Sequence, residues 1–147
     1  MRPNAEQYEE IYRGYMPKSN IVKDCAAAFA IGGAICVLGQ ALLEWYKWAG
    51  AGKETAGTLV SATLIALSGL LTGFGLYDKI ARFAGAGTLV PITGFANSVV
   101  SPAIEFKTEG WILGVGAKMF IIAGPVVVYG TAASALAGMI YMLIGKG

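Results

Sequence analysis

Four stretches of this sequence run for 19 residues or more without a charged side chain. They extend from Cys25 to Leu43, from Thr55 to Tyr77, from Phe83 to Ile104 and from Met119 to Gly145. About 20 predominantly apolar residues are needed for a helix to cross the hydrocarbon core of a bilayer. Charged residues make up 14% of the chain, about half of their share in soluble domains. The sequence therefore predicts an all-α integral membrane protein with three to four transmembrane helices.

Three of these stretches have the composition of ordinary spans. We expect the spans at about residues 25–46, 55–77 and 111–144 of a single membrane domain, 21–147. Gln40 is the one side-chain amide within the first span, and an interhelical hydrogen bond is its expected partner.

Residues 1–20 form a polar N-terminal segment of mixed charge. Its tyrosines Tyr8, Tyr12 and Tyr15 have helix-like spacing. They are typical either of an aromatic belt at the membrane interface or of a short amphipathic helix on its surface. Basic residues in this segment favour a cytoplasmic N-terminus.

The uncharged stretch 83–104 is long enough to span a bilayer, yet its composition opposes a continuous helix. In a helix interior, Gly is less favourable than Ala by about 1 kcal/mol and Pro by about 3 kcal/mol. Five such residues are the predicted helix breakers: Gly85, Gly87, Pro91, Gly94 and Pro102. Non-helical backbone is tolerated at membrane depth only where protein buries it or where it lines a wet cavity. We therefore predict a broken helical segment here that re-enters the membrane. The alternative is a complete crossing, which would make four spans.

Polar side chains within this stretch suggest a path for a solute. The candidates are Thr88, Thr93, Asn97, Ser98 and Ser101. Charged residues flank the stretch and could attract an ion to the mouths of such a path. They are Asp78, Lys79, Arg82, Glu105 and Lys107. Polar groups at membrane depth face a bundle interior or a water-filled path, and charged rings select ions at pore entrances. The alternative is that these hydroxyls and amides only cap broken helix ends. Both interpretations can hold at once.

Several classes of function lack support in the sequence. The chain has no histidine, and its two cysteines are 11 positions apart on one expected helix, so neither a metal centre nor a disulfide between them is predicted. No nucleophile–base pair or nucleotide-binding motif is evident. The basic residues are scattered, which does not indicate a nucleic-acid partner. We expect a non-enzymatic protein without a cofactor.

Three sequence stretches resemble a known family. They are AFAIGGAICVLGQ (Ala28 to Gln40), GFGLYDKIARFAGAGTLVPITGFANSVVSPAIEFKTEGWILGVGAKMF (Gly73 to Phe120) and IAGPVVVYG (Ile122 to Gly130). Together they are similar to the stage V sporulation protein AC family, which is related to the AE proteins of the same operon. The resemblance covers nearly the whole chain from about Lys18, except residues 45–56. The segment EFKTEG and the N-terminal extension favour AC over AE.

The resemblance implies a membrane subunit of the SpoVA complex of endospore-forming bacteria. Such a subunit would act as a channel that conducts dipicolinic acid, with calcium, across the inner membrane of the forespore during sporulation and of the spore at germination. The implied partners are an AE-type membrane subunit and the soluble AD protein, which has a thiolase-like fold and binds dipicolinate. The family brings no catalytic residues.

Two functions remain open at this point. One is a channel subunit, and the other is a non-conducting membrane scaffold that anchors the soluble dipicolinate-binding partner. One chain of three or four helices is too small to enclose a path alone. We therefore expect a homo-oligomer or a hetero-oligomer within the lipid bilayer.

Overall fold

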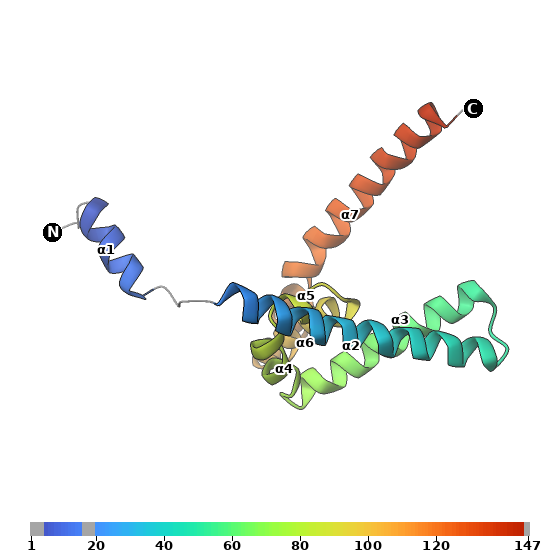
Figure 1. Ribbon diagram of the computed structural model, residues 1–147, viewed down its shortest axis with the longest axis horizontal. Helices are drawn as coiled ribbons and strands as arrows, with labels where there is room; N and C mark the ends of the chain where they lie inside the picture. The colour runs from blue at the N-terminus through green and yellow to red at the C-terminus, as the bar shows by residue number, and fades with distance from the viewer. Residues whose placement is uncertain (1–4, 16–19, 146–147) are drawn as a thin grey trace.

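The structure is a computed structural model that describes residues 5–15 and 20–145, and none of these residues lies in a strand. Its long helices are α2 (Ile21–Trp48), α3 (Lys53–Gly73) and α7 (Ala117–Ile144). Figure 1 shows α2 and α3 as a hairpin, with short helices gathered toward its open end, opposite the α2–α3 loop, and α7 leading away from it. A separate helix, α1 (Ala5–Tyr15), precedes the hairpin. The predicted all-α fold class is confirmed.

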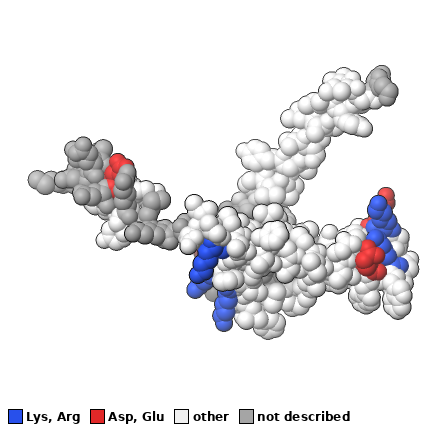
Figure 2. All heavy atoms as spheres, in the orientation of Figure 1, with Lys and Arg blue, Asp and Glu red and all other residues white. Residues whose placement is uncertain are grey.

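Three helical stretches in the described ranges are long and apolar enough to cross a membrane. They are Ile21–Trp48, Lys53–Gly73 and Trp111–Ile144. On the face drawn in Figure 2, charged side chains gather at the two ends of the α2–α3 hairpin, and an uncharged belt lies between them. This distribution suits a hairpin whose ends reach the two water-facing surfaces of a bilayer.

The α2–α3 hairpin is stabilised at its ends by local polar contacts. The side chain of Asn20 caps α2 by accepting a hydrogen bond from the backbone N–H of Lys23 at 3.3 Å. Near the loop, the hydroxyls of Tyr46 and Thr63 lie 2.7 Å apart and join the two helices.

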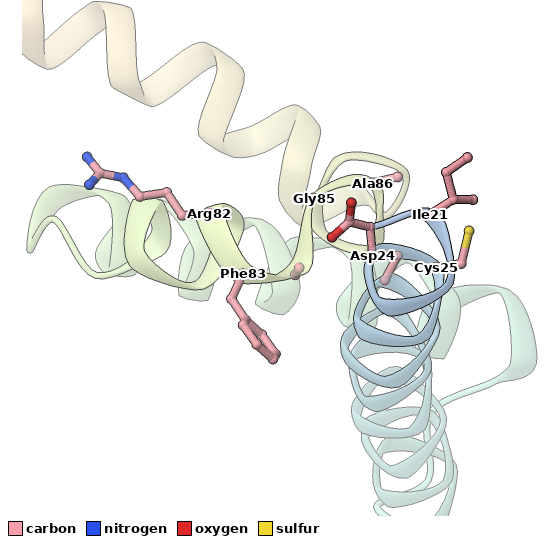
Figure 3. A pocket seen from close by; sticks show the side chains of 9 residues that line it. Ile21, Asp24, Cys25, Arg82, Phe83, Gly85 and Ala86 are labelled. Atoms are coloured by element: carbon pink, nitrogen blue, oxygen red, sulfur yellow. The ribbon is translucent and has the colours of Figure 1, made fainter. Parts of the chain in front are cut away.

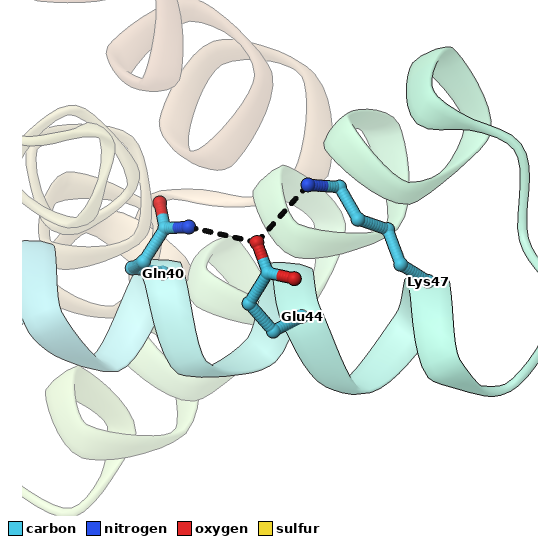
Figure 4. A network of polar contacts seen from close by, with 3 residues as sticks. All are labelled: Gln40, Glu44 and Lys47. Atoms are coloured by element: carbon cyan, nitrogen blue, oxygen red, sulfur yellow. Dashed lines mark hydrogen bonds and ion pairs between the residues drawn. The ribbon is translucent and has the colours of Figure 1, made fainter.

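The amide of Gln40 bonds within its own helix, so the predicted interhelical bond is wrong. Gln40 Nε2 donates to Glu44 Oε1 at 2.9 Å, and Lys47 Nζ lies 3.0 Å from the same oxygen (Figure 4). The carboxylate one turn along α2 is a stronger acceptor than any neutral group on a neighbouring helix. These three side chains form a polar row at the loop end of the hairpin.

The stretch predicted to be broken, 83–104, is divided among three helices, the first of which begins six residues before it. They are α4 (Tyr77–Ala84), α5 (Ala86–Leu89) and α6 (Ile92–Glu105). Gly85 separates α4 from α5 with a φ of +50°, a left-handed value that side chains disfavour. Pro91 precedes the first residue of α6 in an extended conformation. The predicted interruption is therefore present, and these two residues mark its boundaries.

The other three predicted helix breakers lie inside helices, which corrects that part of the prediction. Gly87 belongs to α5, while Gly94 and Pro102 belong to α6. Pro102 removes a single backbone donor near the end of α6, and the helix continues to Glu105. The two glycines are buried where backbone approaches backbone, so they serve packing rather than interruption.

A compact turn joins α6 to the last helix. It consists of a 3₁₀ helix, η1 (Phe106–Glu109), and a π-helix, η2 (Trp111–Gly116), separated by Gly110 with a φ of +97°. Lys118 extends its ammonium group over the ring of Phe106, 4.3 Å from the ring centroid. The turn thereby packs against the start of α7, which then continues through Pro125 as one helix.

Candidate functional site

Two of the predicted path residues belong to a buried cluster of hydroxyl groups. Thr88 and Thr93 are 1% and 7% exposed, and Ser68 of α3 and Tyr77 of α4 are 1% and 4% exposed. The Tyr77 hydroxyl donates to the carbonyl of Thr88 at 2.8 Å and lies 3.2 Å from Thr93 Oγ1. Thr88 Oγ1 donates to the carbonyl of Gly85 at 3.0 Å. These bonds join α4 to both sides of the α5–α6 junction.

Helix α3 contacts α6 through two further hydroxyls. Ser68 Oγ donates to the carbonyl of Thr93 at 2.6 Å. Thr72 Oγ1 lies 2.8 Å from Asn97 Oδ1 and 2.8 Å from the carbonyl of Ser68. A hydroxyl has one proton, so Thr72 donates to one of these two oxygens at a time. When that oxygen is the carbonyl of Ser68, the contact with Asn97 is satisfied if the amide is turned so that its NH₂ group donates to Thr72 Oγ1.

The same two contacts define the direction of α6. Ser68 bonds to Thr93, and Thr72, four residues later in α3, contacts Asn97, four residues later in α6. Helices α3 and α6 are therefore parallel where they touch. The chain between them, which contains α4 and α5, must therefore double back. A chain that doubles back supports the re-entrant interpretation.

The remaining predicted path residues share one side of α6. Asn97, Ser98 and Ser101 occupy positions i, i+1 and i+4, and all three are half-buried. Ser98 Oγ donates to the carbonyl of Phe95 at 2.7 Å within the helix. The five predicted residues therefore separate into two groups. Thr88 and Thr93 bond within the hydroxyl cluster, whereas the three residues of α6 form a polar stripe that is partly accessible.

A close backbone contact holds α5 against α2. A Cβ built on Gly87 would lie 2.8 Å from the Cα of Ala28 and nearer still to its carbonyl oxygen. A Cβ on Gly32 would lie 3.3 Å from the carbonyl oxygen of Gly87. A Cβ cannot lie 2.8 Å from another carbon atom without a clash, so position 87 requires a residue without a side chain.

The predicted mouth charges lie at the surface. Asp78, Lys79 and Arg82 are exposed on α4, and Glu105 and Lys107 are exposed at the end of α6 and in η1. A cavity of about 510 Å³ lies between the start of α2 and the α4–α5 junction, and Asp24 and Arg82 are among its lining residues. Figure 3 shows the guanidinium of Arg82 directed away from the carboxylate of Asp24.

Sequence reasoning did not identify Ser68, Thr72, Tyr77 or Gly32 as part of this region. Ser68 and Thr72 are spaced four residues apart, which places them on one face of α3. That spacing was the available signal, and it did not indicate which element the face contacts. Tyr77 ends an uncharged run, so in the sequence it looks like an ordinary interfacial tyrosine. Only the structure shows that its hydroxyl bonds to Thr88 and Thr93.

Comparison with known proteins agrees with the membrane fold. A family model described as SpoVAC/SpoVAEB sporulation membrane protein matches residues 24–140. The stage V sporulation protein AC of Bacillus subtilis (strain 168) is 49% identical over 142 residues, which cover 96% of this chain and 95% of that protein. No solved structure gives a significant match. The chain belongs to the SpoVAC/SpoVAEB family of sporulation membrane proteins.

Proposed function

We propose that this chain is a non-enzymatic channel subunit that conducts dipicolinic acid, with calcium, across the inner membrane of the forespore and spore. Membership of the family supports a role in the SpoVA system. The observation that carries the proposal is the half-buried polar stripe of Asn97, Ser98 and Ser101 on α6. It lies beside interrupted backbone within a protein whose outer surface is otherwise largely apolar.

A dianion such as dipicolinate crosses bare hydrocarbon only at a high cost in free energy. An ionised carboxylate is strongly disfavoured in an apolar medium unless it is paired or hydrogen-bonded. The NH₂ group of Asn97 can donate hydrogen bonds to such a solute, and the hydroxyl of Ser98 would do so by exchanging its bond to the carbonyl of Phe95. Lys79 and Arg82, both exposed on α4, provide positive charge where the solute would enter.

The proposal includes partners, because one chain does not enclose a path. The polar stripe of α6 would face the equivalent surface of a second copy or of an AE-type membrane subunit. The soluble AD protein would meet the membrane assembly at the exposed charges of α4. The family name supports an AE-type partner, and the sequence resemblance implies the AD protein.

The test measures dipicolinate accumulation and release in spores that carry a substitution in the polar stripe of α6 or at the charged residues of α4. We expect Asn97→Leu and Lys79→Glu to lower dipicolinate accumulation in spores and its release at germination, while membrane levels of the protein remain normal. Asn97→Leu removes a donor from the path, and Lys79→Glu reverses the charge at its mouth.

The matched control is Thr131→Leu. Its hydroxyl is exposed on α7 and bonds its own helix at Val127, 2.7 Å away. This control should leave dipicolinate content unchanged. Normal accumulation and release in both Asn97→Leu and Lys79→Glu spores would contradict the proposed path.

The scaffold function is favoured by a different observation, namely the exposure of Asp78, Lys79 and Arg82 on one short helix. In that case charge reversal on α4 should abolish co-purification with the soluble partner. Substitutions of Asn97 and Ser98 should then be tolerated. The two functions therefore differ in which helix is sensitive to mutation.

A further inference from the structure

One face of α1 carries large apolar side chains that have no neighbour in the packed part of the protein. It consists of Tyr8, Ile11, Tyr12 and Tyr15, which are spaced as i, i+3, i+4 and i+7 along the helix. These side chains are 63%, 54%, 50% and 86% exposed, and the rings of Tyr8 and Tyr12 are stacked on each other. In Figure 1, α1 lies apart from the other described helices. The four residues are called the aromatic face below.

The charged residues of α1 occupy the opposite positions of the helix. They are Glu6, Glu9, Glu10 and Arg13. Their spacing is also i, i+3, i+4 and i+7, and at 3.6 residues per turn these positions lie roughly half a turn from the aromatic face. The helix is therefore amphipathic, and its polar side has three carboxylates against one guanidinium.

The length of α1 requires that something covers the aromatic face. The helix has 11 residues. Isolated helices shorter than about 12–15 residues are marginal in water, and most helices gain their stability from packing of an apolar face. A surface that buries the aromatic face would therefore also stabilise the helix.

The short connection to α2 places α1 at the surface of the membrane. Tyr15 and Asn20 are five residues apart, so the chain between them spans about 18 Å at most. Asn20 caps α2, and the uncharged run of α2 begins at Cys25, about 7.5 Å further along the helix axis. That distance is close to the thickness of one headgroup layer, roughly 5–8 Å. Lipid is therefore the apolar surface that stays within reach of α1 at all times.

We propose that α1 lies in the plane of the membrane interface, with the aromatic face at the boundary between headgroups and acyl chains. A tyrosine ring is apolar with a polar tip, which suits this boundary. Many helices that bind membrane surfaces have Lys and Arg on the polar side and are attracted to anionic lipids. The polar side of α1 has the opposite charge, so binding depends on the aromatic face and not on anionic headgroups. The site is independent of the proposed solute path on α6.

The experiment uses the full chain in phosphatidylcholine nanodiscs, in a background that lacks Cys25 and Cys36. A nitroxide spin label is attached to single cysteines introduced in turn at positions 8 to 15. Power-saturation electron paramagnetic resonance compares collisions of the label with oxygen, which concentrates in lipid, and with a water-soluble nickel complex. We expect the ratio of oxygen to nickel accessibility to be several-fold higher at positions 8, 11, 12 and 15 than at positions 9, 10 and 13.

Two paired variants show which side of α1 is responsible, with labels at Tyr8→Cys and Glu9→Cys. The double variant Tyr12→Ser, Tyr15→Ser removes half of the aromatic face, so the difference between the two labels should fall several-fold. The matched control is Glu6→Gln, Glu10→Gln, which changes two residues of the charged side and should preserve the difference. Replacing half of the phosphatidylcholine with phosphatidylglycerol should not increase it, because the polar side of α1 has no net positive charge.

Three outcomes would overturn the proposal. Equal accessibility ratios at all positions would show that α1 is not adsorbed on the bilayer. Low accessibility of the aromatic face to both reagents would show that protein covers it, either a second copy or another subunit. A difference that appears only with phosphatidylglycerol would show that charge attraction controls binding. Label accessibility and dipicolinate movement are separate measurements, so failure of either proposal is recognisable alone.

Discussion

The hydroxyl of Tyr77 contacts the carbonyl of Thr88 on one side of the α5–α6 junction and the hydroxyl of Thr93 on the other. Single residues hold the broken segment in two ways, by buried hydrogen bonds of this kind and by glycines where no side chain fits. A buried carbonyl that loses its donor costs about 1–3 kcal/mol. The junction therefore depends on side chains that lie outside it in the sequence.

We predict that Gly87→Ala destabilises the protein by about 1–3 kcal/mol, the usual cost of overpacking. The new methyl group would lie 2.8 Å from the Cα of Ala28, and backbone atoms cannot move aside as a flexible side chain can. Thermal unfolding of the purified protein in detergent, followed by circular dichroism, measures the change. Gly33→Ala is the control, because a Cβ there meets nothing within 4 Å. An unfolding temperature of Gly87→Ala equal to that of the control would contradict the close contact.

At the scale of elements, α4 and α6 are arranged around α3 so that the chain doubles back between them. The contacts of Ser68 with Thr93 and of Thr72 with Asn97 give α3 and α6 the same direction. The loop between α2 and α3 lies at the far end of the hairpin in Figure 1. The two flanks of the broken segment should therefore reach the same surface of the membrane.

Cysteine accessibility tests this arrangement in a background that lacks Cys25 and Cys36. We predict that Lys79→Cys and Lys107→Cys react with a membrane-impermeant reagent from the same side. Ala51→Cys, in the loop between α2 and α3, should react from the opposite side. Labelling of the two flanks from opposite sides would show that residues 83–104 cross the membrane completely.

At the scale of the whole molecule, α7 contrasts with the packed centre. Every residue from Val126 to Gly145 is exposed, although the stretch is almost entirely apolar or small. Figure 1 shows this part of α7 projecting away from the α2–α3 hairpin. An apolar helix in a bilayer accepts either lipid or another helix as its neighbour. The polar stripe of α6 also remains half-buried in one chain, so a path would be completed by a neighbouring subunit.

We predict that the purified protein has a mass above that of one chain when it is measured by native mass spectrometry in mild detergent. The measurement is made for the chain alone and for the chain co-expressed with an AE-type subunit, which separates a homo-oligomer from a hetero-oligomer. Assembly should bury the half-buried stripe of Asn97, Ser98 and Ser101. A single chain in both preparations would contradict the expectation.

The sequence alone determined the membrane location, the all-α class and the position of the interruption. These properties depend on the length of uncharged runs and on local backbone preferences, both of which are properties of neighbouring residues. Gly85 and Pro91 lie at boundaries for this reason. The family resemblance also needed only the sequence, and the comparisons confirm it.

The tertiary structure decided which polar groups are internal and which are accessible. Thr88 and Asn97 look alike in an uncharged stretch, but Thr88 is buried and its carbonyl accepts from Tyr77, whereas Asn97 is half-buried and contacts Thr72 of α3. The partners that Ser68 and Thr72 find are each 25 residues away, and the acceptor of Gln40 is a single turn along its own helix. A hydrogen bond depends on distance in space, and only the packing of α3, α4 and α6 brings these groups within reach of one another.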